Sequence, residues 1–333
     1  MANDDTTAPR YPAPVPASTS PSASPQRTPL DAAMALAGAQ SHPAPALYVV
    51  ATPIGNLADL GFRALHVLGL ADAIACEDTR HTAPLLARFG LERKPLLAAH
   101  RHNERSAAAA VLERLGRGER VALVSDAGTP AVSDPGAAVV EAARLAGHRI
   151  VPIPGASSLL AVLAAAGDVA GAEHGFVFRG FVGAKTAERL DAAARIAADP
   201  ATQILLEAPH RIESLAAALG SALGERPVTV GRELTKQFET VATMPASDLA
   251  GWLAADADRT RGEFALVVHA APQDAPADAG LDAETVRILG VLLAELPLKQ
   301  AVSLAAQITR APRNALYDEA LARRAAREAP PST

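Results

Sequence analysis

One stretch constrains the fold of this chain more than any other: VALVSDAGTPAVSDPG, at residues 121–136. The apolar run Val121–Val124 is typical of a buried parallel strand, and it changes abruptly into Ser, Asp, Gly, Thr and Pro. Glycines and prolines make a rigid loop whose backbone can approach a ligand closely. In open α/β sheets, ligands bind beyond the carboxyl ends of the strands. The stretch therefore predicts a ligand site at a strand end, followed by a helix with Asp134 as its N-cap and Pro135 in its first turn.

Composition sets limits on what the protein can be. The 333 residues, 49% of them apolar, suffice for roughly two domains. The formal net charge of −5 argues against a basic surface overall, so any nucleic-acid site must be a local patch. The single cysteine, Cys76, excludes an internal disulfide framework and favours a reducing cytoplasm. No apolar run approaches the ~18 residues of a membrane span, so a soluble protein without a membrane partner is expected.

The chain divides into segments of different character. Residues 1–45 are rich in Ala, Pro, Ser and Thr, and this composition predicts a disordered tail. Residues 46–167 alternate between strand and helix patterns, which predicts an α/β domain with a mainly parallel sheet. Residues 168–270 predict a second α/β domain, and hairpin-like spacing in its latter part favours a mixed sheet. Residues 271–280 are expected to form a linker, and 281–333 a helical appendage interrupted at Pro297 and Pro312.

Four loops follow four strands of the first predicted domain, at residues 52–57, 77–81, 126–136 and 154–158. If the sheet is parallel, all four converge on one edge, and we expect the site there. None of these loops matches the dinucleotide-binding motif G-x-G-x-x-G or the phosphate-loop motif G-x-x-x-x-G-K-[ST]. The sequence therefore does not favour a nicotinamide or nucleoside triphosphate cofactor. Rigid loops that offer backbone groups suit a small polar ligand with an amino-acid end and an adenosine end.

Six motifs then occur in a particular order and spacing: TPIGNLADL, EDTRHTAPLLARFG, VSDAGTPAVSDPG, PGASS, EAPHRI and GRELTKQFET. Together they resemble the family of 16S ribosomal RNA cytidine 2′-O-methyltransferases, which lies within the tetrapyrrole-methylase-like enzymes that use S-adenosylmethionine. The likeness runs from about Leu47 to Val268 and returns in LPLKQAVSLAAQI and NALYDEAL. The SDAGTP and SDPG segments are common to the wider class, whereas EDTRHT and RELTK point to the rRNA branch.

The resemblance implies two α/β domains with S-adenosylmethionine bound in the cleft between them, usually in a homodimer. Carried over by motif, the residues expected to hold the cofactor are Pro53, Gly55, Asn56, Asp126, Ala127, Gly128, Thr129, Pro130, Ser133, Pro154, Gly155, Ala156 and Ser157. For Asp126 an alternative is a loop cap that bonds its own backbone.

Methyl transfer to a ribose hydroxyl needs in-line positioning and a general base, or a cation that stabilises the developing alkoxide. The candidate bases at predicted loops or strand ends are Glu77, Asp78, His100, Glu104, Glu207 and His210. The candidate cations are Arg80, Lys185, Arg211 and Lys236. For each of the acids and histidines, a purely structural ion pair or helix cap is the alternative. No metal is expected.

Binding of 16S rRNA or the small ribosomal subunit would need phosphate contacts. The candidates are Arg93, Lys94, Arg101, Arg105, Arg114, Arg117, Arg120, Lys185, Arg189, Arg195 and, in the appendage, Lys299, Arg310, Arg313, Arg323, Arg324 and Arg327. The aromatic content of 3% offers little for base stacking, which favours a folded RNA surface over free single strands. Two other functions stay open: methylation of a small tetrapyrrole, and noncatalytic binding to the ribosome.

Overall fold

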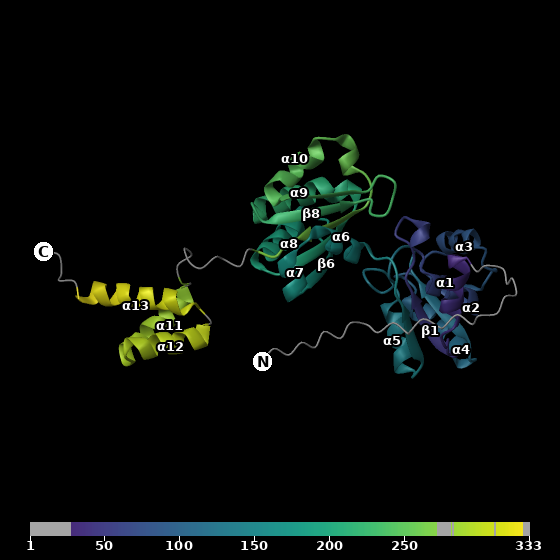
Figure 1. Cartoon of the computed structure of the whole chain (residues 1–333), viewed down its shortest axis with the longest axis horizontal. Coiled ribbons are helices and arrows are strands. Elements are labelled where there is room, and N and C mark those ends of the chain that lie inside the picture. Colours follow the sequence, from purple (N-terminus) through teal and green to yellow (C-terminus); the bar gives the residue numbers. More distant parts are fainter. Residues whose placement is uncertain (1–27, 272–280, 282, 310, 329–333) are drawn as a thin grey trace, which may run out of the picture. The chain divides into compact units, whose positions relative to one another are not determined.

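The computed structural model describes residues 28–271, 281, 283–309 and 311–328 (Figure 1). The chain forms two compact units, which divide between Ser157 and Ser158. The predicted boundary after residue 167 is therefore wrong. Helix α6 (Ser158–Ala166) belongs to the second unit because it packs on the second sheet, where a Cβ on Gly231 would lie only 2.9 Å from Val162.

The first unit contains a five-stranded sheet in the order β3-β2-β4-β1-β5, and every neighbouring pair is parallel. This confirms the parallel sheet expected from the alternating pattern. β3 is the one strand that the pattern does not indicate, since it is only three residues long and not fully buried. The strands are β1 (Ala46–Val50), β2 (Ala73–Cys76), β3 (Leu96–Ala98), β4 (Arg120–Val124) and β5 (Arg149–Ile153).

Helices cover both faces of this sheet. Tyr48 and Ile74 point toward α2 (Phe62–Leu70) and α3 (Thr79–Arg88), whereas Leu47 and Leu123 point toward α4 (Glu104–Gly116) and α5 (Ala137–Leu145). Because successive residues of a strand face opposite sides, a sheet buried on both faces needs strands that are apolar throughout. The short helix η1 (Leu57–Asp59) follows β1.

The start of α5 differs from the prediction. Asp134 and Pro135 lie before the helix, and Gly136 is its N-cap. The reason is local backbone geometry: Ser133 has a φ of 70° and Gly136 a φ of 123°, and neither value is helical.

The prediction of disorder over residues 1–45 is wrong for residues 28–45, and residues 1–27 lie outside the described part. Helix α1 (Pro29–Gly38) begins with a capping box, in which Thr28 accepts from the amide of Asp31 and the Asp31 carboxylate accepts from Thr28. The segment after this helix packs against the first unit. The rings of His42 and His66 lie 4.8 Å apart, and the Tyr48 hydroxyl donates a hydrogen bond to the carbonyl of Pro43 at 2.7 Å. Capping and tertiary contacts thus order a segment of weakly apolar composition.

The second unit contains the sheet β6-β7-β10-β8-β9, which is mixed as predicted. β6 and β7 are parallel, whereas β10 runs antiparallel to both β7 and β8. Consequently β6, β7 and β8 end at the same edge, where Phe264 pairs with Glu207 on one side and Arg232 on the other. The strands are β6 (Phe176–Phe181), β7 (Thr202–Glu207), β8 (Pro227–Arg232), β9 (Thr240–Pro245) and β10 (Phe264–Val268).

One face of the second sheet packs against three helices through a core that includes Leu205, Leu219 and Leu266. These helices are α8 (Thr186–Ala198), α9 (Ile212–Leu223) and α10 (Leu249–Ala254). The shorter elements of the unit are α7 (Val169–His174), η2 (Pro209–Arg211), η3 (Ala246–Asp248) and η4 (Ala257–Thr260).

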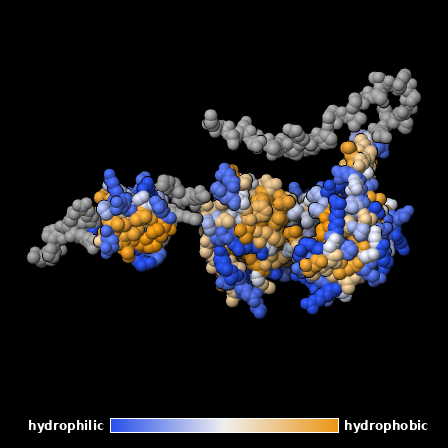
Figure 2. Space-filling view, turned by 90° about the horizontal axis from the view of Figure 1, so that it is seen from below, coloured by the Kyte–Doolittle hydropathy of each residue, from blue (hydrophilic) through white to orange (hydrophobic). Residues whose placement is uncertain are grey.

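Three C-terminal helices have a core of their own around Leu289, Ala305 and Leu316. They are α11 (Ala283–Glu295), α12 (Leu298–Thr309) and α13 (Arg313–Glu328), so the predicted interruptions at Pro297 and Pro312 are confirmed. Apolar side chains are also exposed on these helices (Figure 2). The predicted linker lies, apart from residue 271, outside the described residues. Over the described ranges, no helix has the length and apolarity needed to cross a membrane.

Candidate functional site

Four loops at the carboxyl edge of the first sheet are joined to one another. We call them the first rim: residues 51–57, 77–81, 125–136 and 154–157. Thr52 and Gly128 form an isolated antiparallel bridge through hydrogen bonds of 2.9 and 3.0 Å. The Thr129 hydroxyl donates to the carbonyl of Ala156 at 3.3 Å. The loops after β1, β4 and β5 therefore form one connected surface.

Asp126 connects the remaining loop, which follows β2. Its Oδ1 accepts from the backbone amide of Asp78 at 3.1 Å, and its Oδ2 lies 2.8 Å from Nδ1 of His81. The Asp126 side chain therefore bonds another loop, and not its own backbone as the loop-cap alternative proposes. With this contact the predicted convergence of all four loops on one edge is confirmed.

The backbone of the first rim is closely packed. Gly128 has a φ of +81°, and a Cβ there would lie 3.4 Å from Ile54. A Cβ on Gly155 would approach the Cβ of Ala51 to 3.0 Å. Ser133 adopts a left-handed φ although it is not glycine. Such a loop presents backbone donors and acceptors directly to a ligand.

The other predicted cofactor residues lie in the same loops and differ in exposure. Those buried in the loops are Pro53 and Pro130, and those exposed are Gly55, Asn56, Ala127 and Pro154. Ser157 is partly exposed. Asn56 caps η1 by accepting from the amide of Ala58 at 3.0 Å. The buried members fix the loop shape, and Gly55, Ala127 and Pro154 are exposed at the surface of the rim.

A hollow of about 410 Å³ opens at the side of the first rim near β2 and β3. Burial, followed by the charges of Asp134 and Asp126, raises the pKa of Glu77. Burial also raises the pKa of Asp134, while a hydrogen bond from Ser125 opposes that shift. The residues that line the hollow are Glu77, Asp78, Thr79, Arg80, Ala98, His100 and Asp126.

Asp78 and Arg80 are engaged with each other. The Arg80 guanidinium donates to both oxygens of Asp78, with a shortest distance of 2.6 Å, and these hydrogen bonds lower the pKa of Asp78 to about 2. The Asp78 carboxylate also caps α3. A carboxylate with so low a pKa is a poor proton acceptor, so the capping alternative describes Asp78 better than the role of general base.

Glu104 and Arg101 also have structural roles. The Glu104 carboxylate accepts from the amide of Gly136 at 2.8 Å and so satisfies the start of α5. The Arg101 guanidinium donates to the carbonyl of Ser133 at 2.8 Å. Arg101, His81 and Asp134 support the first rim, although the sequence analysis names none of them as a cofactor or catalytic residue. Their positions beside strand ends and within the EDTRHT and SDPG motifs were the available signal.

The structure brings five other candidates to the edge where β6, β7 and β8 end. We call this edge the second rim: residues 182–185, 207–211 and 233–236. Glu207 has a fully buried side chain, and its Oε1 lies 3.0 Å from Nε of Arg211. The exposed His210 lies in the same turn. Lys185 is 83% exposed, with a carboxylate oxygen of Glu188 at 3.5 Å.

Lys236, also in the second rim, is held between two carboxylates. Its Nζ lies 2.9 Å from Glu233 and 3.1 Å from Glu263. Burial lowers the pKa of Lys236, but the hydrogen bonds to both carboxylates outweigh this effect and raise it. Lys236 is therefore cationic, with its charge already compensated.

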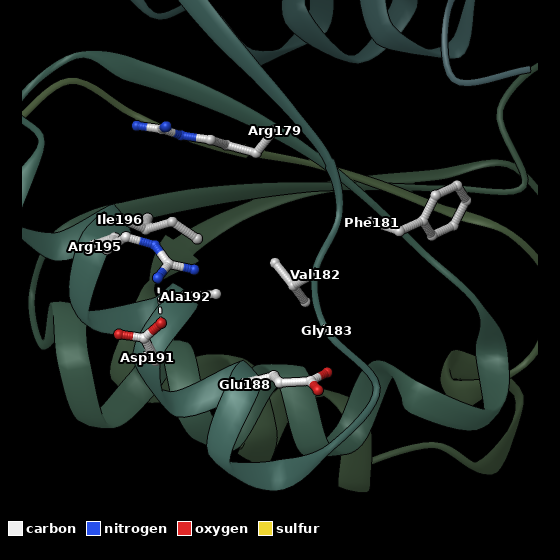
Figure 3. Close-up of a pocket in the computed structure, with 9 residues that line it drawn as sticks. All are labelled: Arg179, Phe181, Val182, Gly183, Glu188, Asp191, Ala192, Arg195 and Ile196. Carbon is white, nitrogen blue, oxygen red and sulfur yellow. Dashed lines mark hydrogen bonds and ion pairs between the residues drawn. The ribbon is translucent and has the colours of Figure 1, made fainter.

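Many of the predicted phosphate contacts are occupied by partners within the chain. Arg117 bonds Glu113 and Glu119, Arg114 bonds Glu119, and Lys94 donates to a backbone carbonyl. Arg195 pairs with Asp191 beside a pocket of about 430 Å³ between β6 and α8 (Figure 3). The same holds in the appendage for Arg313 and Arg323. Arg310 and the side chains of Arg324 and Arg327 lie outside the described part.

In the described ranges, no group of three or more His, Cys, Asp or Glu side chains is arranged to hold a metal ion. Cys76 is buried, and burial raises the pKa of its thiol, as expected for an unreactive core cysteine.

Comparison with solved structures supports the fold. The chain is similar to the methyltransferase CobJ, with a TM-score of 0.51 and 20% identity, over 70% of this chain and 97% of that one. It is also similar to diphthine synthase, with a TM-score of 0.50 and 17% identity, over 67% of this chain and 89% of that one.

Sequence comparison is more specific. Residues 46–250 match the family model of tetrapyrrole (corrin/porphyrin) methylases, and residues 279–324 match an RsmI C-terminal HTH domain. The chain is 47% identical to ribosomal RNA small subunit methyltransferase I of Pseudomonas aeruginosa, over 83% of this chain and 97% of the relative. Its identity to the protein of the same name from Escherichia coli O157:H7 is 46%, over 83% and 94%. The expected resemblance and fold class are thereby confirmed, and the chain belongs to the tetrapyrrole methylase family, in the branch of the ribosomal RNA small subunit methyltransferases I.

Proposed function

We propose that this protein transfers a methyl group from S-adenosylmethionine to the 2′-oxygen of a cytidine ribose in 16S rRNA of the small ribosomal subunit. The observation that carries the proposal is the 47% identity to a ribosomal RNA small subunit methyltransferase I, over 97% of the relative's length. The EDTRHT and RELTK motifs, which resemble the rRNA branch, favour RNA over a tetrapyrrole. The same relatives argue against a purely noncatalytic ribosome-binding role.

The first rim fits the proposed cofactor. A Cβ at Gly155 would be crowded against Ala51, and Gly128 has a left-handed φ that favours glycine, so the backbone of these loops can lie against a nucleoside. The Asp126 and Glu77 carboxylates supply negative charge beside this backbone, which suits a cationic ligand. When bound, S-adenosylmethionine supplies an electrophilic methyl group on a sulfonium. The residues proposed to hold it are those of the loops at 53–56, 126–133 and 154–157.

The proposed general base is Glu77. Among the predicted bases, Asp78 is fixed by Arg80, Glu104 caps α5, and Glu207 is buried, whereas Glu77 lines the hollow. A raised pKa brings a carboxylate closer to the proton affinity that a base needs near neutral pH. In this role Glu77 would accept the proton of the ribose 2′-hydroxyl, whose oxygen would take the methyl group as the methyl–sulfur bond breaks and S-adenosylhomocysteine leaves. His100, also in the hollow, is the alternative.

The test is incubation of the purified protein with radiolabelled S-adenosylmethionine and small subunits from cells that lack this methylation. We expect label in a cytidine ribose after nuclease digestion. The Glu77→Gln variant should lose about 10²-fold or more in kcat while it still binds the cofactor. Label in a porphyrinoid and none in RNA would favour the tetrapyrrole alternative, and label in neither would contradict both.

Two further properties belong to the proposal. Family resemblance supports a homodimer, which sedimentation equilibrium tests directly. The single buried thiol and a ribosomal substrate support a cytoplasmic location, which fractionation of cells tests.

A further inference from the structure

In the second rim, arginine side chains hydrogen-bond the backbone of Val182 and Ala184, and Gly183 between them packs closely against α8. The Arg211 guanidinium donates to the carbonyl of Val182, and the Arg189 guanidinium donates to the carbonyl of Ala184 at 2.9 Å. Between them, a Cβ on Gly183 would lie 2.5 Å from the Cβ of Glu188. Figure 3 shows this segment leaving β6 and turning toward α8. Side chains from η2 and from the first turns of α8 therefore fix the path of the chain into Lys185.

This arrangement buries charge. Arg189 is only 7% exposed, and its Nε has no hydrogen-bond partner in the structure. The Glu207 side chain is fully buried, and its Oε2 also lacks a partner. Buried charged groups are costly unless their interactions compensate, so such an arrangement indicates a fixed geometry that the protein needs.

Glu207 directs Arg211. Its Oε1 lies 3.0 Å from Nε of Arg211 and accepts from the amide of Ala208 at 2.9 Å. The carboxylate thus pairs with the guanidinium by charge, although Nε of Arg211 makes no hydrogen bond, while another nitrogen of that guanidinium bonds Val182. A fully buried carboxylate cannot reach the hydroxyl of an RNA ligand, which excludes Glu207 from the role of general base in this structure.

We infer that Glu207, Arg211 and Arg189 are positioning residues that fix the segment 182–185 so that Lys185 contacts a phosphate of the RNA substrate. Lys185 is the cation that the segment presents, at 83% exposure, and its ion pair with Glu188 is long and exposed. This inference rests on the proposed function and deepens it, because it assigns the second rim to RNA binding and not to proton transfer.

A double-mutant cycle on the full-length protein tests the inference. Lys185→Ala should raise the KM for small subunits about fivefold, leave kcat within twofold, and reduce the slope of log KM against log salt by about 1. Arg211→Ala should raise the same KM, yet add less than twofold in the Lys185→Ala background. Gly183→Ala should displace the same segment through a clash with Glu188, and it should therefore also raise the KM for small subunits. The matched control is Arg261→Ala, which removes an exposed cation paired with Asp258 at a similar i,i+3 spacing.

Glu207→Gln separates positioning from proton transfer. As a positioning residue, it should change KM for subunits and leave the shape of the pH profile of kcat unaltered. A loss of about 10²-fold or more in kcat, together with a lost acid limb, would overturn the inference. Additive effects of Arg211→Ala and Lys185→Ala would overturn it as well.

Amide hydrogen exchange gives a readout that does not depend on methyl transfer. In variants that melt as cooperatively as the wild type, Arg211→Ala should accelerate exchange at residues 183–186. If the wild type methylated no RNA while Arg211→Ala accelerated exchange, the proposed function would fail, but the role of Arg211 in fixing residues 182–185 would stand. Unchanged exchange in Arg211→Ala would contradict that role.

Discussion

The carboxylate of Asp126 accepts a hydrogen bond from the backbone amide of Asp78 at 3.1 Å, and this contact ties the loop after β4 to the loop after β2. The two residues are far apart in the sequence. Their contact is what makes the acidic hollow and the glycine-rich loop parts of one surface.

Removal of this tie should weaken cofactor binding. In Asp126→Ala, the lost charge-assisted hydrogen bonds on a partly exposed side chain should cost about 1 kcal/mol, or about fivefold in the Kd for S-adenosylmethionine. Isothermal titration calorimetry measures this directly. Asp126→Asn keeps an acceptor for the Asp78 amide and should lose less. An unaltered Kd in the Ala variant would argue against a role of this tie.

The ion pair of His81 with Asp126 should make stability depend on pH. The hydrogen bond and charge of Asp126 raise the pKa of His81 above its ordinary value of about 6.5. Stability from a raised histidine pKa is fully present below the unfolded-state pKa and is lost as pH rises through the folded-state pKa. His81→Gln should therefore melt below the wild type at about pH 6, and the difference should vanish by about pH 8.5. NMR titration of the His81 ring should give a lower pKa in Asp126→Asn.

Asp134 should also make stability fall as pH rises, because burial disfavours its charged form. Burial raises its pKa, so the folded state favours the protonated form, and this stability is lost as pH rises through the folded-state pKa. Asp134→Asn, which stays neutral, should melt above the wild type at about pH 7.5, and the two should converge near pH 4. The exposed Asp248, changed to Asn, serves as control. A lower melting temperature for Asp134→Asn at about pH 7.5 would contradict the prediction.

Gly128 should matter for both stability and binding. Gly128→Ala places a side chain at a φ of +81° and should destabilise the protein by about 1 kcal/mol while it also raises the Kd for S-adenosylmethionine. Gly90 provides a matched control, because its φ is +67° and the space around it is open. Gly90→Ala should cost similar stability and leave the Kd unchanged. Chemical denaturation and calorimetry distinguish the two.

The C-terminal helices should contribute to substrate binding. Leu316→Ala opens a cavity in their core and should destabilise them by about 2–5 kcal/mol. We expect a raised KM for small subunits and an unaltered Kd for S-adenosylmethionine. Leu321→Ala, an exposed position on the same helix, is the control. If Leu316→Ala and Leu321→Ala had equal KM values for small subunits, these helices would not contribute to RNA binding.

Much of the fold could be predicted because its signals are local. Apolar runs followed by Gly, Pro and Asp mark the strands and the loops that follow them, and their order implies a parallel sheet. That sheet in turn brings the loops after β1, β2, β4 and β5 to one edge. Elements without a strong local signal were missed: β3 is short, and α1 depends on its capping box and on packing near His66.

The sequence by itself determined the order of elements and the residue types at each strand end. Only the tertiary structure decided which of those residues are buried and which are exposed. Glu207 and Lys185 look equally available in the sequence, yet one is fully buried against Arg211 and the other is 83% exposed. Burial depends on packing against elements distant in the chain, such as β10, whose Phe264 pairs with Glu207. No local pattern could therefore show which of the two side chains is enclosed and which is exposed.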